Sequence, residues 1–342
     1  MQHEITRPIP LLDGRGNLTE AGYAKRLLPV YDRARVRGGA TRLKEWDYYL
    51  VMNDRFALAL TIADNSYMGL DSISLLDFNE GWQETRSPMR ILPMGRTGLP
   101  PTSLRGDVGV SGRGYGIFFR NNGEKRMLAA HMEKFRDGKD LDVQIVLTDA
   151  PEESMVICTP FHKPGHFYYN QKINCMRATG RVTLGERIYS FRPEHSFGTL
   201  DWGRGVWTYH NTWYWGSGSG LADGVPFGFN IGYGFGDTSA ASENMLFYDG
   251  KAHKLSQVAF HIPRRGGRDD FMSPWTFTSD DGRFEMDFVP MLDRAACTSV
   301  GVIKSDQHQV FGKFTGRAVL DGGGVIELKD FMGFAEKVEN KW

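Results

Sequence analysis

The sequence has few cysteines, no excess charge of either sign and no long apolar segment. The three cysteines, Cys158, Cys175 and Cys297, are far apart and form no CxxC pair, so reduced thiols are expected instead of a disulfide framework. Lys and Arg number 41 and Asp and Glu also 41, a balance that argues against a nucleic-acid binder. No window approaches about 18 consecutive apolar residues, so no transmembrane segment is expected. Because the first ten residues lack a secretory-signal pattern, we expect a soluble cytoplasmic protein.

Familiar catalytic signatures are also missing. The sequence contains no GxSxG elbow, no P-loop and no HExxH zinc motif. The run GRGVW at 203–207 lacks the spacing of a dinucleotide fingerprint. The nine histidines are dispersed along the chain. We therefore expect no metal and no cofactor.

Glycine is abundant, and its placement predicts β-structure. The chain has 41 glycines, about 12% of its residues against an average near 7%. Residues 56–64 alternate bulky and small side chains, the period of a strand. In residues 227–236 one face is aromatic or aliphatic and the other is nearly all glycine, which lets another backbone, a ring or a ligand approach closely. Asp249-Gly250 predicts a two-residue hairpin turn.

Helical signals are few. Residues 19–28, with Thr19 as N-cap, predict one helix. The many short alternating segments predict an all-β fold of two packed lipocalin-like barrel or sandwich domains with few short helices. Turn-rich sequence near 150–166 places the expected boundary between an N-terminal domain, 1–160, and a C-terminal domain, 161–342.

The densest candidate for chemistry is the stretch 200–216, which contains four of the eight tryptophans. Arg204 and Asp201 lie among these indoles, where the carboxylate is placed to orient the guanidinium or to be activated by it. Stacked indoles suit a ring-bearing or unsaturated substrate. The alternative is an internal Asp201–Arg204 ion pair that closes a barrel, with the tryptophans as packing.

Three further segments carry candidate side chains. Glu243 and Asn244 precede a strand, and a carboxyl group near tryptophans is a candidate acid with a raised pKa; the alternative is a turn-capping pair. Trp46 and Tyr48 share a face of a predicted strand, while Asp64 lies either at a cavity or in an Asx turn. Residues 166–172 place His166, Tyr168, Asn170 and Lys172 on one face, which lines either a polar pocket or the exposed surface.

Together these segments resemble the bacterial DUF2804 family, a domain of unknown function, over nearly the whole chain. The resemblance is carried by KEWDYY at 44–49, LTIADNSY at 60–67, LDWGRGVW at 200–207, ENM at 243–245, DG at 249–250, FVPMLDR at 288–294, QVFG at 309–312 and GFAE at 333–336. More distantly, the chain is similar to the lipocalin-like carotenoid 1,2-hydratase and AttH group. That similarity implies two packed β-barrel-like domains and hydratase or cyclase activity on hydrophobic compounds, commonly without a metal or redox cofactor.

The favoured hypothesis is a cofactor-independent lyase, hydratase or cyclase that acts on a hydrophobic or aromatic small molecule. A carboxylic acid kept protonated in a Trp-lined pocket would supply the proton. The alternatives are a non-catalytic protein that binds a lipid-like ligand and a carbohydrate-active hydrolase or lyase. The predicted catalytic residues are Asp201, Glu243 and Arg204. The predicted substrate-binding residues are Trp202, Trp207, Tyr209, His210, Trp213, Tyr214, Asn230, Asn244, Asp64, Trp46 and Tyr48.

Overall fold

The structure is a computed structural model that describes residues 2–37, 39, 41–300 and 303–341, without the side chains of 298–300, 303 and 304. Regular structure in these residues is almost entirely β, and the helical structure among them is one short 3-10 helix, η1 (Arg33–Arg35). The predicted all-β class is therefore confirmed. In the described part of the chain, no helix combines the length and the apolar character needed to cross a membrane.

The first sheet contains 14 strands of the described chain and curls into a half-barrel. Its main path runs β7 (Trp82–Arg86), β6 (Met68–Asp77), β5 (Phe56–Asp64), β4 (Leu43–Met52), β16 (Phe197–Val206), β14 (Phe167–Leu184), β12 (Lys139–Thr148), β11 (Arg126–Arg136), β10 (Tyr115–Asn121) and β9 (Val108–Gly112). Four strands pair off this path: β2 (Gly22–Ala24), β8 (Met89–Ile91), β13 (Met155–Pro160) and β15 (Arg187–Phe191).

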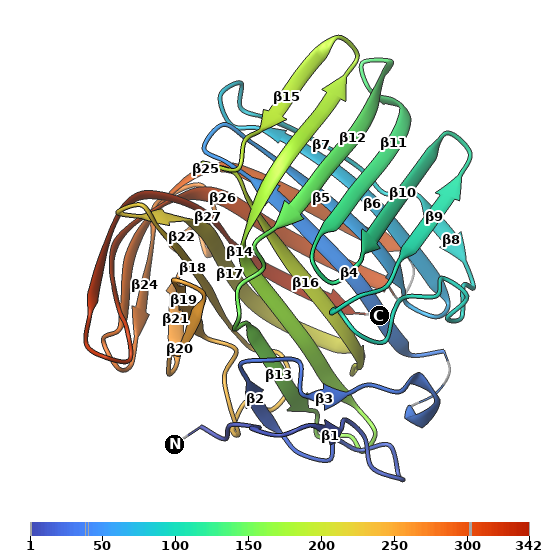
Figure 1. Cartoon of the computed structure of the whole chain (residues 1–342), viewed down its shortest axis with the longest axis vertical. Coiled ribbons are helices and arrows are strands. Elements are labelled where there is room, and N and C mark those ends of the chain that lie inside the picture. The colour runs from blue at the N-terminus through green and yellow to red at the C-terminus, as the bar shows by residue number, and fades with distance from the viewer. Residues whose placement is uncertain (1, 38, 40, 301–302, 342) are drawn as a thin grey trace.

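The second sheet contains nine strands of the described chain. Its order is β20 (Lys251–Lys254), β19 (Met245–Tyr248), β18 (Val225–Tyr233), β17 (His210–Ala222), β27 (Val325–Lys341), β26 (Ile303–Val319), β25 (Phe284–Val300), β24 (Trp275–Ser279) and β21 (Val258–His261). Two small pairs lie apart: β1 (Ile9–Pro10) with β3 (Pro29–Val30), and β22 (Arg264–Arg265) with β23 (Arg268–Asp269). Figure 1 shows the strands of the first sheet, coloured from blue to yellow-green, beside those of the second, coloured from yellow to red.

The alternation predicted for residues 56–64 is confirmed, because these residues form β5. Leu58, Leu60 and Ile62 point into the core of the first sheet. The small side chains Ala57 and Ala59 point to the other face, where they join a second apolar cluster that includes residues of the second sheet. The bulky face of β5 therefore fills its own half-barrel, and the small face allows the second sheet to pack closely.

The glycine-rich face of β18 also lies between the sheets. Phe227, Phe229 and Ile231 fill the core of the second sheet, and the glycines face away from it. A Cβ atom added at Gly228 would lie 2.7 Å from the sulfur of Cys175 on β14. The predicted close approach is thus made by a strand of the first sheet. The hairpin predicted at Asp249-Gly250 is also confirmed, since it joins β19 to β20.

The predicted helix at residues 19–28 is wrong. Gly22–Ala24 form β2, which pairs with β13, and Gly22 has a φ of +159°. Edge pairing therefore outweighs the local helical propensity of this segment. The domain boundary at residue 160 stays a prediction. The chain passes from the first sheet to the second later, between β16 and β17.

Gly203 provides a stability test of how Trp46 packs on the first sheet. A Cβ atom at this position would overlap the ring of Trp46, which lies across β16. We expect Gly203→Ala to lower the free energy of unfolding by about 1–3 kcal/mol, the usual cost of overpacking. Urea unfolding measures this change, with Gly322→Ala as the control because nothing lies within 4 Å of a Cβ atom there. Equal stability of the two variants would show that Trp46 does not occupy this position.

Candidate functional site

The candidate site lies between the two sheets, where β14 and β16 of the first meet β17 and β18 of the second. The amide of Asn174 on β14 donates to the Ser217 hydroxyl at 2.8 Å and to the Phe229 carbonyl at 3.2 Å. The hydroxyls of Thr199 and Ser219 are 3.1 Å apart. These buried hydrogen bonds fix the two sheets against each other, so side chains from both sheets share one interior.

A buried ion pair occupies the first-sheet side of this interior. The ammonium nitrogen of Lys172 lies 2.9 Å from Oδ2 of Asp201 and 3.7 Å from the ring centroid of Trp215 on β17. Tyr168, Asn170 and Lys172 are all buried on one face of β14. The exposed-face interpretation of this segment is therefore wrong, and the polar-pocket interpretation stays a prediction.

Asn170 presents a buried acceptor to the same interior. Its Nδ2 donates to Oδ1 of Asp201 at 2.6 Å. Because a carboxylate only accepts, this bond fixes the amide so that Oδ1 points away from Asp201. That Oδ1 is buried without a hydrogen-bond partner. A buried acceptor of this kind calls for a donor from water or a ligand.

Glu243 brings a carboxylic acid from the second sheet. A Cβ atom at Gly232 would lie 2.7 Å from its Oε1, so the bare face of β18 makes room for this carboxyl group. Part of the side chain is accessible to solvent, but Oε2 is buried and has no hydrogen-bond partner. Burial raises the pKa of Glu243, and the nearby Lys172 opposes that rise. The desolvated oxygen is therefore free to carry a proton.

Glu336 on β27 is a second buried acid, and it was not among the predicted site residues. Its Oε1 accepts from Nε1 of Trp213 at 3.0 Å, and its Oε2 accepts from Nε2 of Gln309 at 3.0 Å. Arg294 donates in turn to Oε1 of Gln309 at 2.8 Å. Burial raises the pKa of Glu336 to about 7, against the opposing effect of the Trp213 hydrogen bond. The GFAE motif at 333–336 was the sequence signal that could have identified it.

The pKa of Glu336 predicts a pH dependence of stability. Since the pKa rises from 4.5 to about 7 on folding, the folded state holds the proton more tightly than the unfolded state. The stabilisation contributed by Glu336 is then complete below pH 4.5 and is lost as the pH rises to 7, by roughly 3 kcal/mol in total. Urea unfolding between pH 4.5 and 7 should show this loss of unfolding free energy in the wild type and not in Glu336→Gln. A parallel loss in the variant would contradict the assignment.

A cluster of aromatic rings lies beside Glu336, to which one of them, Trp213, donates a hydrogen bond. We call Trp46, Tyr168, Trp207, Trp213 and Phe235 the aromatic group. Their ring centroids lie 5.3 Å apart for Trp46 and Trp207, 4.9 Å for Trp207 and Phe235, and 5.3 Å for Trp213 and Phe235. The three indoles are partly exposed. Because Trp213 also donates to Glu336, the aromatic group joins the surface to the buried acids.

Lys44 lies beside the aromatic group on the same face of β4 as Trp46 and Tyr48. Its ammonium nitrogen is 5.4 Å from the ring centroid of Trp207 and 5.2 Å from that of Tyr67. Burial lowers the pKa of Lys44 to about 7, and repulsion from Arg42 adds to this effect. The charge next to the rings therefore changes near neutral pH.

The structure does not bring Arg204 together with Asp201. Residues three apart in a strand point to opposite faces, and Arg204 is buried in the core of the first sheet. Its guanidinium lies 3.1 Å from Oδ1 of Asp47, donates to the Pro100 carbonyl at 2.7 Å, and stacks 4.1 Å from the ring centroid of Trp202. Arg204 and Trp202 thus belong to a packed core instead of the interior between the sheets.

Asp64 and Asn244 make local structural bonds. Oδ1 of Asp64 accepts from the Ser66 amide at 2.9 Å, and Oδ2 accepts from the Gly95 amide at 2.8 Å. This is the Asx-turn alternative. Oδ1 of Asn244 accepts from the Gly232 amide at 2.7 Å. Both side chains hold backbone segments in place.

Of the remaining predicted residues, some lie in the interior between the sheets and the others lie on the opposite face of β17 or at the surface. Asn230 accepts from Nε1 of Trp215 at 2.7 Å and donates to the Glu243 carbonyl at 2.8 Å, so it supports the site. Tyr48 packs against Trp215, and its buried hydroxyl has no hydrogen-bond partner. Tyr214 stacks on the ring of Tyr233 at 4.5 Å, on the opposite face of β17. Tyr209 and His210 are exposed.

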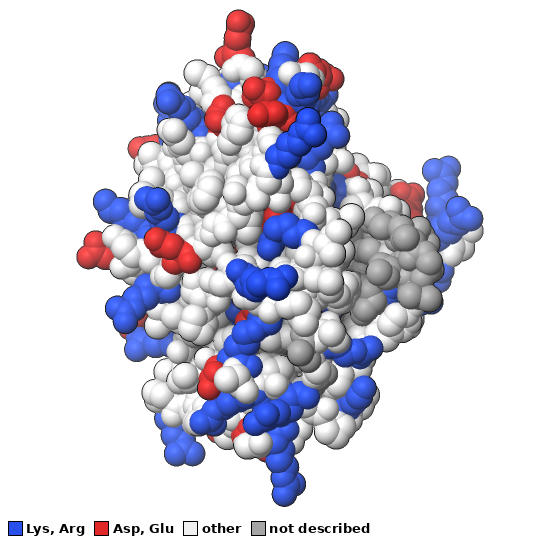
Figure 2. Space-filling model, turned by 90° about the vertical axis from the view of Figure 1, so that its right-hand side faces the viewer, with Lys and Arg blue, Asp and Glu red and all other residues white. Residues whose placement is uncertain are grey.

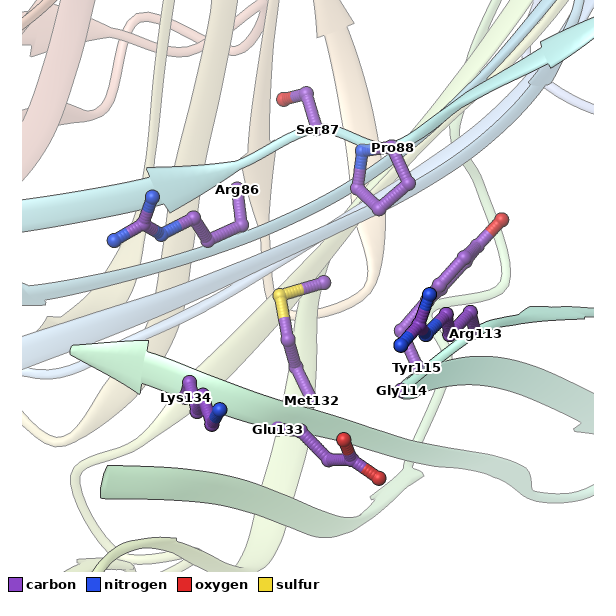
Figure 3. A pocket seen from close by; sticks show the side chains of 9 residues that line it. All are labelled: Arg86, Ser87, Pro88, Arg113, Gly114, Tyr115, Met132, Glu133 and Lys134. Atoms are coloured by element: carbon purple, nitrogen blue, oxygen red, sulfur yellow. The ribbon is translucent and has the colours of Figure 1, made fainter. Parts of the chain in front are cut away.

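Two open pockets lie away from these residues. One, of about 490 Å³, is lined by residues 86–88, 113–115 and 132–134, and Figure 3 shows Met132 pointing from β11 toward the segment after β7. The other, of about 250 Å³, is lined by Asp142, Gln144, Arg181 and Thr183. Figure 2 shows that basic side chains predominate on one face, so the balanced charge is unevenly distributed. Neither pocket contains a buried acid beside aromatic rings, and we place the candidate site between the sheets.

A family model for DUF2804, described as a domain of unknown function, matches residues 2–342. The chain belongs to the DUF2804 family. The predicted resemblance to this family is therefore confirmed over residues 2–342. No curated protein matches it by sequence.

The solved structures similar to this DUF2804 protein include three proteins of low sequence identity. A Nitrosomonas europaea protein provisionally assigned as AttH is 14% identical, with a TM-score of 0.54, 86% of this chain covered and 92% of that chain. CghA is 14% identical, with a TM-score of 0.49 and coverages of 100% and 97%. Kievitone hydratase from Nectria haematococca is 8% identical, with a TM-score of 0.47 and 98% of each chain covered. The AttH similarity confirms the predicted fold relationship. At these sequence identities, the activities of the similar proteins cannot be assigned to the DUF2804 protein.

Proposed function

We propose that this DUF2804 protein is a cofactor-independent lyase, hydratase or cyclase that acts on a hydrophobic or aromatic small molecule between its two sheets. The observation that carries the proposal is Glu243, whose buried Oε2 has no partner and whose pKa is raised by burial. A desolvated acid of this kind keeps its proton to a higher pH than an exposed glutamate does, which is what a general acid requires. Tyr168 of the aromatic group is close enough for Glu243 to raise its pKa, and the rings of this group offer faces that would stabilise a developing carbocation.

The residues around Glu243 suit an acid-initiated addition to a double bond. Proton transfer from Glu243 to one alkene carbon leaves a cation on the other carbon and a carboxylate on Glu243. Water then attacks the cation, and its released proton returns to Glu243, so the atoms and charges balance. The ammonium of Lys172, which lowers the pKa of Glu243, stabilises the transient carboxylate. Oδ1 of Asn170 is a buried acceptor available to hold the attacking water.

Asp201 takes a different role in this proposal from Glu243. Both of its oxygens are engaged, one with Lys172 and the other with Asn170. It therefore orients these two side chains and is not itself the proton donor. Trp213, partly exposed and bonded to Glu336, is the ring whose displacement would admit a substrate. The cytoplasmic location stays a prediction.

The proposal is tested by incubating the purified protein, without added cofactors, with a panel of hydrophobic and aromatic compounds that contain double bonds. The reactions are run in heavy-oxygen water and in D₂O and followed by mass spectrometry. A hydratase incorporates solvent oxygen, and a cyclase or isomerase incorporates solvent deuterium alone. Compounds that bind but return unchanged would instead support a ligand-binding protein, and cleavage of oligosaccharides would support a carbohydrate-active enzyme. The proposal would be overturned if no compound of the panel were bound and none were converted.

A further inference from the structure

A group of side chains with potential metal-ligating atoms lies on β25 and β26, outside the site between the sheets. Cys297 and Asp306 are cross-strand partners, and His308 follows two residues after Asp306 on the same face. One ligand atom from each residue lies within 4.8 Å of the others. Asp306 Oδ1 is 2.8 Å from the Cys297 sulfur and 3.6 Å from Nε2 of His308.

The imidazole of His308 is held in the orientation that a metal ligand requires. Its Nδ1 bonds to Oδ2 of Asp293 at 2.6 Å. Its ring stacks on Phe271, with centroids 3.9 Å apart and an angle of 14° between the planes. These two contacts leave Nε2 toward Asp306. A carboxylate on the second nitrogen is the usual support of a metal-bound histidine, because it fixes the tautomer and the ring orientation.

We propose that Cys297, Asp306 and His308 form a divalent transition-metal site, with Zn²⁺ as its ion. Thiolate, imidazole and carboxylate are the zinc ligands of proteins, at about 2.3, 2.0 and 2.1 Å, so tetrahedral ligand atoms are roughly 3.3–3.6 Å apart. The distance from Asp306 to His308 already fits this spacing, and the distance from Asp306 to Cys297 widens when the metal enters. The thiol proton passes to solvent, and the fourth position is left to water.

Such a site would join two adjacent strands of the second sheet. No helical spacing motif marks it, because its ligands come from neighbouring antiparallel strands. The expectation of no metal came from a search for sequential motifs, which does not detect cross-strand ligands. The carboxyl group of Asp293 contributes from outside the coordination sphere, and its Oδ1 is buried without a partner.

The test is calorimetric titration of the full chain, stripped of metal with chelator, with Zn²⁺. We expect one site whose dissociation constant rises about 10-fold in Asp293→Asn, the usual range for a supporting carboxylate, and by more in Cys297→Ser and His308→Ala. The control is His131→Ala, which removes an exposed histidine paired with Asp142 on the first sheet at 2.9 Å. Zn²⁺ affinity that is equal in wild type, Cys297→Ser and His308→Ala would overturn the proposal.

Two measurements on the wild type do not depend on the folding of variants. Co²⁺ should give a thiolate-to-cobalt charge-transfer absorption. Zn²⁺ should also protect Cys297 from alkylation. Because Cys158 and Cys175 are buried and Cys297 is exposed, the alkylating reagent should report mainly on Cys297. Unchanged alkylation of Cys297 at saturating Zn²⁺, or cobalt binding without the thiolate absorption, would contradict ligation by the sulfur.

Discussion

Replacing Glu243 with glutamine is expected to lower turnover of any converted compound by about 10²–10⁴-fold, the contribution of a positioned general acid. The amide keeps the shape of the side chain and removes the transferable proton. The fold should persist, because the buried Oε2 of Glu243 makes no hydrogen bond that the substitution would break. The rate constant kcat for the isotope-labelled reaction measures the loss, and circular dichroism and urea unfolding confirm that the variant is folded.

Glu186→Gln is the matched control for this experiment. Glu186 is exposed in the turn between β14 and β15, far along the chain from the acids between the sheets, and its substitution should leave kcat unchanged. Turnover by Glu243→Gln at the level of Glu186→Gln would remove Glu243 from the mechanism. A loss in Glu336→Gln alone would transfer the donor role to Glu336.

Replacing Arg204 with methionine is expected to lower the free energy of unfolding by about 3–5 kcal/mol, because one member of a buried ion pair is left without its partner. Asp47 lies 3.1 Å from the guanidinium of Arg204, and burial already raises the pKa of Asp47 despite that charge. Without Arg204, Asp47 must be buried either as an unpaired carboxylate or as a neutral acid. Urea unfolding at neutral pH measures the loss.

Arg26→Met provides the comparison for a surface ion pair. Arg26 pairs with Glu152, and both side chains are more than half exposed. Its substitution should change stability by less than about 1 kcal/mol, as is usual for exposed pairs. If Arg204→Met were as mild as Arg26→Met but abolished turnover, the guanidinium would belong to the reaction instead of the core.

Local pattern predicted much of the fold. The alternation of residues 56–64, the glycine face of residues 227–236 and the turn at Asp249-Gly250 each depend on neighbouring residues, so sequence alone contains their signal. The helix predicted from Thr19 failed because pairing of β2 with β13 is a contact between distant segments. Which strands join which sheet depends on such distant contacts, and this information is not present in a single segment.

The candidate site was predicted in part. Period two already placed Tyr168, Asn170 and Lys172 on one face, and the structure adds that this face is buried against the second sheet. Asp201 and Arg204 are three residues apart in β16, so the strand places them on opposite faces. Glu336 comes from the last strand, and its approach to Trp213 depends on the pairing of β17 with β27.

The most direct test of the account is infrared detection of protonated carboxylic acids in the folded protein at pH 6. Exposed Asp and Glu are ionised at this pH, whereas Glu336, with a pKa of about 7, should keep its proton. Burial shifts the pKa of Glu243 in the same direction, and the proposed mechanism requires Glu243 to be protonated as well. We predict a protonated-carboxyl carbonyl band that loses intensity separately in Glu336→Gln and in Glu243→Gln. A spectrum without that band, or a band unaffected by both substitutions, would contradict the presence of proton-donating acids between the sheets.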